Sequence, residues 1–147
     1  MTVDEIRAIP GEWHRLLRDL ERLEYLRAAA TSVPALATDS VKVQVSVRNR
    51  SMVIVDELVD LERDLSARLE AMSRKEHAAE EMFKAVREPD RKVLVYFYVR
   101  HLTMRQIAEI LFFSPRYCYK LRRRGLEAVE RSESGEDKKA VQVQSDD

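Results

Sequence analysis

The chain has little of the residues that shape disulfide-bonded or β-rich folds. Its 147 residues include one Cys, three Gly and four Pro. A single Cys excludes an intramolecular disulfide framework and any multi-cysteine zinc site, and it fits a reducing cytosol. With few Gly and Pro and 35 % charged residues, the composition favours long helices, in one domain or in a small domain with an extended appendage.

Other absences narrow the function. No uninterrupted apolar run reaches membrane-spanning length, and the start of the chain, MTVDEIRAIP, lacks the basic and apolar parts of an export signal. We therefore expect a soluble, intracellular protein without membrane contact. Glycine-rich phosphate loops, nucleophile elbows and paired acids are also missing, so we predict no catalytic residue, no metal site, no cofactor and no enzymatic activity.

Charge is present in quantity but is unevenly placed. The formal net charge is +0, yet residues 1–89 hold 14 Lys/Arg against 17 Asp/Glu, and residues 132–147 hold 2 against 5. Residues 90–131, in contrast, hold 10 against 4. A basic block inside a neutral chain is where a polyanion is expected to bind.

The first half of the chain carries two amphipathic helical patterns. After a lead-in over residues 1–11, which ends in Pro10-Gly11, apolar residues recur at three- and four-residue steps over residues 12–30. A longer pattern covers residues 51–88. The two helices would measure roughly 30 Å and 55 Å, so we predict a coiled-coil-like antiparallel hairpin over residues 12–88. The excess length must pack on the C-terminal domain or on another chain, which makes a homodimer one expectation.

Residues 31–50 are predicted to connect the two helices. Within them, SVKVQVSVR at 40–48 alternates strictly between Val and polar residues, as in a half-buried strand. A strand would need a partner, which AVQVQ at 140–144 or a second subunit could supply. An extended, mobile loop is the favoured interpretation, and the paired strand is the alternative.

Pro89 marks the start of a C-terminal domain, which we predict to span residues 89–131. Three helices are expected there, over residues 91–101, 103–112 and 115–131. Thr103 and Gln106 form a capping box, and Ser114 followed by Pro115 begins the last helix. The polar and acidic tail, residues 132–147, is predicted to be disordered.

The last two helices have the dimensions of a helix-turn-helix unit. Their buried faces are predicted to hold Ile107, Ala108, Leu111, Cys118, Leu121 and Leu126. The exposed candidates on the last helix are Arg116, Tyr117, Tyr119, Lys120, Arg122, Arg123 and Arg124.

In a helix-turn-helix unit the N-terminal residues of the second helix meet base edges in the major groove. We therefore expect Arg116, Tyr117 and Lys120 to read bases, and the run Arg122–Arg124 to hold phosphates. A solvated basic helix end is the alternative interpretation. Arg116, however, is a cation at a helix start, where it opposes the helix dipole and calls for an anion.

A family resemblance supports this interpretation. PDRKVLVYFYVRHLTMRQIAEILFFSPRYCYKLRRRGLEAVE resembles region 4 of sigma-70-type transcription factors. The span from about residue 12 to 131 is similar to the DUF1492-type phage and prophage proteins, which are related to the ArpU/RinA transcriptional regulators. The matching segments, in the same order, are LERLEYLRAAATSVP, LVDLERDL, LTMRQIAEIL and SPRYCYKLRRRGLEAV.

The resemblance implies an all-α protein in which a helical hairpin precedes a three-helix, sigma-region-4-like helix-turn-helix domain. It also implies a DNA-binding transcription regulator in the cytoplasm of a bacterial host cell, with double-stranded DNA as its partner. The chain has His101 and Phe112 where the family usually has Gly. If the position of Phe112 requires positive φ, a bulky residue costs on the order of 1–2 kcal/mol there, and Phe112 or Phe113 is expected to fill the core.

Two other functions stay open on the sequence. Small terminase subunits, which package DNA, also join a helix-turn-helix to helical oligomerisation segments, and they form rings of many subunits. A protein-interaction module docking on host RNA polymerase would instead use the hairpin as its contact surface, with the basic helix serving solubility alone.

Overall fold

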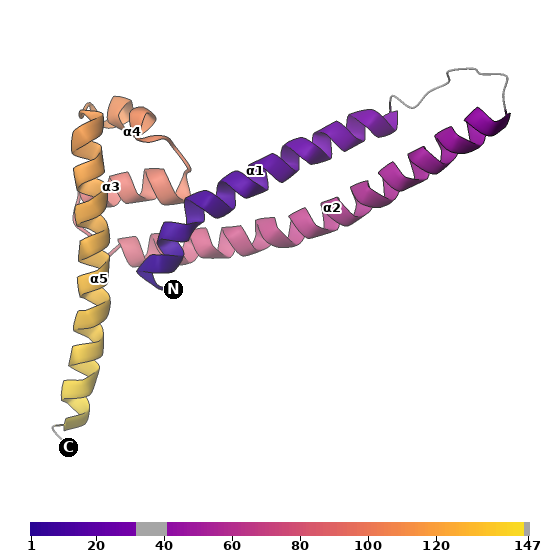
Figure 1. The fold of residues 1–147 in the computed structure, drawn as a ribbon. Coiled ribbons are helices and arrows are strands. Elements are labelled where there is room, and N and C mark those ends of the chain that lie inside the picture. Colours follow the sequence, from indigo (N-terminus) through magenta and orange to yellow (C-terminus); the bar gives the residue numbers. More distant parts are fainter. Residues whose placement is uncertain (32–40, 146–147) are drawn as a thin grey trace. The chain divides into compact units, whose positions relative to one another are not determined.

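The protein is helical throughout the part of the chain that the structure describes. The computed structural model describes the backbone of residues 1–31 and 41–145 and the side chains of residues 1–31, 50 and 52–135. Within these ranges there is no β-strand, so the predicted all-α class is confirmed. The elements are α1 (Val3–Thr31), α2 (Val41–Phe83), α3 (Asp90–Leu94), the π-helix η1 (Val95–Val99), α4 (Met104–Leu111) and α5 (Pro115–Ser145) (Figure 1). None of the described helices is long and apolar enough to cross a membrane.

Residue contacts divide the chain into two compact units. The first unit combines Met1–Pro10 with Ser73–Asp147, and the second is Gly11–Met72. The domain boundary predicted near residue 88 therefore lies inside the first unit. The N-terminal residues, which the sequence assigns to a lead-in, belong to the same unit as the basic C-terminal helices.

The second unit is held together by an apolar seam between α1 and α2. Its buried residues are Leu16 and Leu23 of α1 and Leu65 of α2. Trp13, Leu20, Leu58 and Leu61 pack against them. At the edge of the seam, Arg68 donates to the carboxylates of Asp19 at 2.6 Å and of Asp64 at 3.2 Å. The apolar spacing predicted for both helices thus faces a common core.

The predicted lead-in over residues 1–11 is wrong, because α1 begins at Val3 and continues through Pro10. A proline inside a helix costs about 3 kcal/mol, since it lacks an N–H group and its ring crowds the preceding turn. Val3, Ile6 and Ile9 are buried, with exposed fractions of 4 %, 0 % and 0 %. Burying each such side chain contributes about 1.5–3 kcal/mol, which together outweighs the cost of the proline.

The predicted extended connection over residues 31–50 is wrong from Val41 onward, where α2 begins. The alternating segment at 40–48 is therefore neither a strand nor a loop over 41–48, and residues 32–40 lie outside the described residues. An isolated strand leaves its backbone N–H and C=O groups without partners, whereas a helix satisfies them internally. With no strand in the described ranges to pair with, the helical alternative is the more stable one.

The helix predicted to reach residue 88 ends earlier, at Phe83. Three further backbone hydrogen bonds of the i to i−3 type tighten the chain after it, from Lys84, Ala85 and Val86. A cis peptide bond joins Glu88 to Pro89. The next predicted helix, 91–101, is present as α3 followed directly by η1, and it stops before His101, whose φ is 57°.

The predicted disordered tail is also wrong, because α5 continues to Ser145. Only residues 146–147 lie outside the described backbone. The polar composition of residues 132–145 suggested disorder, but the segment has no Pro and one Gly, and seven of its 14 residues are Glu, Lys, Gln or Ala. Most of these are favourable helix formers, so a helix already stabilised by packing upstream can continue through them.

The packing of α5 against α3 depends on a glycine. A Cβ atom built on Gly125 would lie 2.7 Å from Cδ1 and 3.0 Å from Cγ of Leu94, whose side chain is fully buried. In contrast, nothing lies within 4 Å of a Cβ built on Gly135, further along the same helix. A side chain at residue 125 would therefore require the buried Leu94 side chain to shift.

We predict opposite effects for alanine at these two glycines. Gly135→Ala removes the helix penalty of glycine and should raise the free energy of unfolding by up to about 1 kcal/mol. Gly125→Ala gains the same helix propensity but overpacks Leu94, so its stability should lie about 1–3 kcal/mol below that of Gly135→Ala. Urea unfolding followed by circular dichroism measures both, and equal stability of the two variants would contradict the close packing.

Candidate nucleic-acid interface

The interface begins with α4, whose start is fixed by a capping box. The Thr103 hydroxyl accepts a hydrogen bond from the backbone N–H of Gln106 at 3.2 Å, and the Gln106 side chain accepts one from the Thr103 N–H at 2.9 Å. The predicted capping box is therefore confirmed. Two backbone donors that the helix itself leaves unpaired are satisfied in this way.

The turn after α4 places Phe112 in the left-handed region, at φ 58° and ψ 37°. Its N–H donates to the carbonyl of Ala108, as does the N–H of Phe113 at 3.0 Å. Phe112 is 94 % exposed, whereas Phe113 packs against the core. Of the two residues expected to fill the core at this turn, Phe113 does so.

Helix α5 then starts as the sequence predicts. The Ser114 hydroxyl accepts from the backbone N–H of Tyr117 at 3.2 Å, and Pro115 occupies the first helical position. Proline is well suited to that position because its missing N–H would have no partner there. Only residues 112–114 separate α4 from α5, so the two helices are joined by a tight turn.

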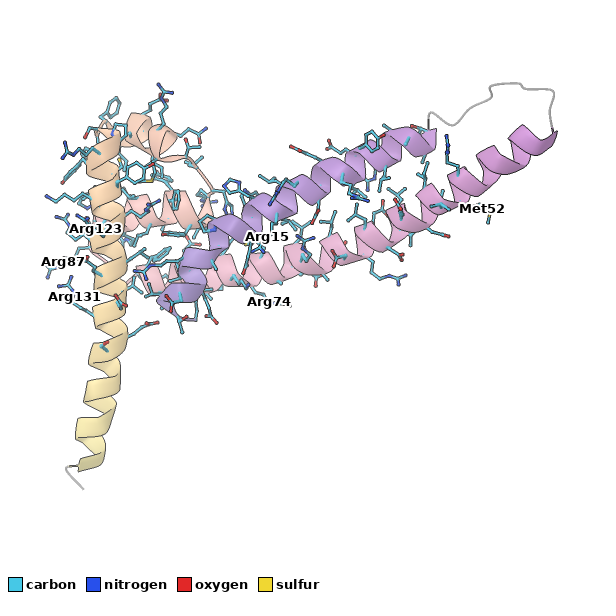
Figure 2. All side chains as sticks on the ribbon, in the orientation of Figure 1. Arg15, Met52, Arg74, Arg87, Arg123 and Arg131 are labelled. Atoms are coloured by element: carbon cyan, nitrogen blue, oxygen red, sulfur yellow. The ribbon has the colours of Figure 1, made fainter. Side chains whose placement is uncertain are left out.

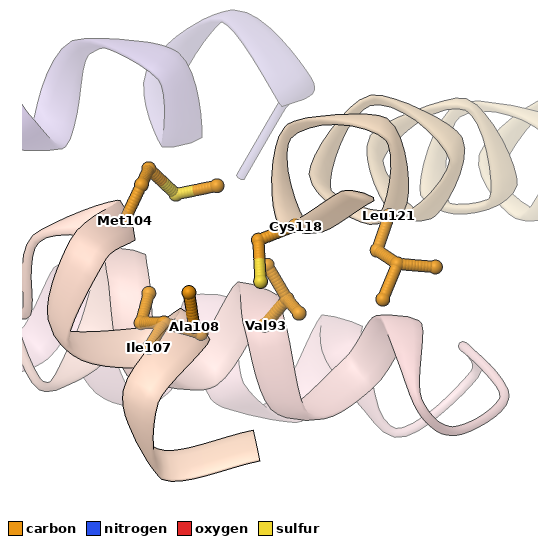
Figure 3. Packing of buried hydrophobic residues seen from close by; sticks show 6 residues of the cluster. All are labelled: Val93, Met104, Ile107, Ala108, Cys118 and Leu121. Carbon is orange, nitrogen blue, oxygen red and sulfur yellow. The ribbon is translucent and has the colours of Figure 1, made fainter. Parts of the chain in front are cut away.

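A small core holds α3, α4 and α5 together. Figure 3 shows the buried side chains of Val93, Met104, Ile107, Ala108, Cys118 and Leu121 facing one another. The predicted burial of Ile107, Ala108, Cys118, Leu121 and Leu126 is confirmed, and Leu111 is half-buried against the same cluster. Burial raises the pKa of the Cys118 thiol, which keeps it protonated and supports a packing role.

With these residues buried, most of the predicted site residues are exposed. Arg116, Tyr117, Tyr119, Lys120, Arg123 and Arg124 are exposed, and Arg122 is half-buried. A shallow depression on α5 is lined by Ser114, Arg116, Tyr117, Tyr119, Lys120 and Arg123. Arg123 is labelled on α5 in Figure 2. Five of the seven predicted site residues are thus brought together on one surface.

Arg124 has a different environment, because it forms an ion pair with Asp90. Its Nε and Nη2 atoms donate to the two carboxylate oxygens of Asp90, each at 2.7 Å. Asp90 is only 7 % exposed. The bidentate hydrogen bonds and the charge of Asp90 raise the pKa of Arg124 above its usual value. The Arg124 guanidinium therefore ties α5 to the first residue of α3.

Arg122 is held by aromatic rings. Its guanidinium carbon lies 4.5 Å from the centre of the Phe97 ring and 5.0 Å from that of Tyr119. Stacking of this kind favours a planar cation and orients it. The sequence did not identify Asp90 or Phe97 as partners of α5, because these residues belong to other elements: Asp90 to α3 and Phe97 to η1.

The remaining cations of α5 are not neutralised within the described residues. No Asp or Glu occurs between Pro115 and Leu126. In the part of the chain with described side chains, Arg116, Lys120 and Arg123 form no ion pair. Arg116 also lies in the first turn of α5, where the helix dipole is positive. These three cations on one helix surface are suited to bind an external anion.

His101, which stands where the resemblance expects glycine, also has positive φ. Its Nε2 lies 2.6 Å from a carboxylate oxygen of Glu76, and the His101 side chain is only 10 % exposed. The pair joins the C-terminal part of α2 to the turn before α4. Glu76 thus has a structural partner, and no cluster of His, Cys, Asp and Glu able to hold a metal ion occurs among the described residues.

Comparisons of the chain with protein-family models, with curated proteins and with solved structures give no match. The function is therefore argued from the geometry of α4 and α5 and from the chemistry of their exposed side chains.

We predict that Phe112→Gly stabilises the protein. Glycine adopts the left-handed conformation without the steric cost of a Cβ atom, although it also gains freedom in the unfolded chain, so the net gain should be about 0.5–1 kcal/mol. Phe112→Ala is the matched control, because it removes the exposed ring but keeps the Cβ atom. Thermal unfolding should rank the glycine variant above the alanine variant, and equal stability would contradict backbone strain at this turn.

Proposed function

We propose that α4 and α5 form a helix-turn-helix unit and that the first turns of α5 enter the major groove of duplex DNA. The single observation that supports this most directly is the group of exposed, unpaired cations Arg116, Lys120 and Arg123 on one surface of α5. The three-residue turn and the buried Ala108 fit the dimensions of such a unit. We include in this proposal the arrangement that the family resemblance implies, in which a helical hairpin precedes a sigma-region-4-like helix-turn-helix domain.

The biochemical role we propose is that of a sequence-specific transcription regulator of the phage and prophage type. Arg116, Tyr117 and Lys120 lie in the first two turns of α5 and would meet base edges, since the N-terminal part of a recognition helix does so. Arg or Lys can donate to the guanine O6 and N7 atoms there. Arg123 would hold a phosphate.

Arg122 and Arg124 have a more limited part in this proposal. Both were expected to hold phosphates, but Arg124 donates to Asp90 and Arg122 stacks on Phe97. Each guanidinium still adds positive charge close to Arg123. We therefore assign Arg124 mainly to orienting α5. Arg122, which forms no ion pair among the described residues, remains able to contact a phosphate.

The proposal is tested by selecting bound duplexes from a random pool and measuring affinity at several salt concentrations. Lys120→Ala should relax the preference at one base pair, at a cost of about 1–3 kcal/mol for the preferred duplex. Arg123→Ala should weaken binding to all duplexes similarly and reduce the slope of log K against log salt by about 1.

Arg74→Ala is the control for these variants, because Arg74 is an exposed cation on α2 in the same unit (Figure 2). It should leave both the preference and the salt slope unchanged. Failure of the wild-type protein to enrich any duplex would count against the proposal. Unchanged DNA retention after neutralising Arg123 would favour the alternative of an interaction module that docks on RNA polymerase.

We further propose a homodimer through α2, on the strength of an exposed apolar stripe. Met52, Val55 and Val59 are 66 %, 45 % and 46 % exposed, and their spacing of three and four residues places them on one side of the helix. Leu58, Leu61 and Leu65 face α1 from a different side. A second copy would cover the stripe, and a two-fold dimer suits a symmetric DNA site.

Light scattering checks this association. The wild-type protein should have the mass of a dimer, and Val55→Glu should be a monomer because it buries a carboxylate in the interface. Val53→Glu is the matched control, since Val53 is 57 % exposed but lies off the stripe, and it should remain dimeric. A monomeric wild-type protein would contradict the proposal, and a ring of many subunits would favour the DNA-packaging alternative.

A further inference from the structure

A second concave surface of the first unit lies between the start of α1, η1 and α5. Among the residues that line it are Arg7, Tyr98, Tyr119, Arg122, Arg123 and Glu127. Tyr119 and Arg123 also line the depression at the start of α5. This groove, called here the Arg7 groove, is therefore adjacent to the surface that we propose for DNA.

Arg7 is directed to the groove by the amphipathic start of α1. Val3, Ile6 and Ile9 are buried, and Arg7 is on the exposed side of the same turns. Half of the Arg7 side chain is exposed, and among the described residues its ion-pair partner is Asp4, at 3.6 Å. Asp4 is itself 93 % exposed, so the pair is weak and Arg7 can exchange it for another anion.

The groove gathers positive charge around a tyrosine. Arg7, Arg122 and Arg123 contribute three guanidinium groups, against the single carboxylate of Glu127. Burial raises the pKa of the Tyr98 hydroxyl, and the charges of Arg122 and Arg7 act on it in the opposite direction. Arg7, Arg122 and Tyr98 all line the groove, and the Tyr98 hydroxyl stays protonated.

We propose that the Arg7 groove holds a backbone phosphate of the DNA duplex that α5 binds, with Arg7 as a DNA contact supplied by the opposite end of the chain. This inference rests on the proposed function and extends it by one binding site. Three guanidiniums in a concave surface repel one another unless an anion is present. A phosphate is favoured over the carboxylate of a partner protein because Arg123 and Tyr119 belong to both surfaces, so a duplex in contact with one would pass along the other.

The environment of Arg122 supports a phosphate site. Its guanidinium lies over the rings of Phe97 and Tyr119, which restrains the position of the group, and it forms no ion pair among the described residues. A guanidinium oriented in advance loses less side-chain freedom when it binds a phosphate. Arg7 and Arg123, which are exposed, can adjust to the phosphate from either side.

The test measures the affinity of the full chain for its selected duplex over a series of salt concentrations. Arg7→Ala should weaken binding several-fold and reduce the slope of log K against log salt by about 0.9, the value for one lost phosphate contact. The order of preference among duplexes should not change, since a phosphate carries no sequence information. Arg7→Lys should keep most of the salt slope.

Asp4→Asn provides a variant with the opposite effect. It removes the carboxylate that competes for Arg7 and should tighten binding to every duplex, a gain that a purely structural role of Arg7 would not produce. Arg18→Ala is the matched control, because Arg18 is an exposed cation of α1 that does not line the groove. It should bind as the wild type does.

The outcomes separate this inference from the proposed function. If the wild type selects a duplex and Lys120→Ala relaxes its preference, but Arg7→Ala and Asp4→Asn bind as the wild type does, the phosphate site is overturned and the helix-turn-helix proposal stands. If the wild type enriches no duplex, both are overturned. Equal thermal unfolding of Arg7→Ala and wild type would show that a loss of binding is not a loss of fold.

Discussion

The close contact between α5 and α3 is the constraint on which the basic surface depends. At Gly125 there is no room for a side chain against the buried Leu94. The residue before it in α5, Arg124, forms a bidentate ion pair with Asp90 of α3. An apolar contact and a charged one therefore fix the same short stretch of helix. Because a helix is stiff over this length, fixing Arg124 and Gly125 also fixes the direction of the residues that precede them. The orientation of the cations in the first turns of α5 therefore depends on this contact.

The cations of α5 serve two purposes that depend on what each side chain meets. Arg124 and Arg122 are engaged inside the unit, by a carboxylate and by aromatic rings. Arg116, Lys120 and Arg123 have no ion-pair partner in the described part of the chain. A run of three arginines looks uniform in a sequence, but its members point in different directions because successive residues of a helix are rotated by about 100°. The functional proposal rests on the unpaired members.

The secondary-structure predictions that were wrong have a common cause. The Pro10-Gly11 pair predicts a break, yet α1 continues through it because Val3, Ile6 and Ile9 are buried. The alternation of Val and polar residues predicts an extended segment, yet α2 begins at Val41 in a chain with no strand among its described residues. Propensities of about 1–3 kcal/mol at single residues are outweighed by tertiary burial and by the need to pair backbone groups. The capping residues Thr103 and Ser114, by contrast, act within three residues and were predicted correctly.

The amino-acid sequence by itself determined the helical class, the starts of α4 and α5, the buried face of Ile107, Cys118 and Leu121, and the concentration of positive charge near the C-terminus. These features depend on spacing and on hydrogen bonds between near neighbours, which a linear pattern records. Only the tertiary structure decided that Asp90 neutralises Arg124, that Phe97 orients Arg122, and that Arg7 lines a groove beside Arg123. The partners in each of these contacts are distant in the sequence, and they meet because packing of apolar faces brings their helices together.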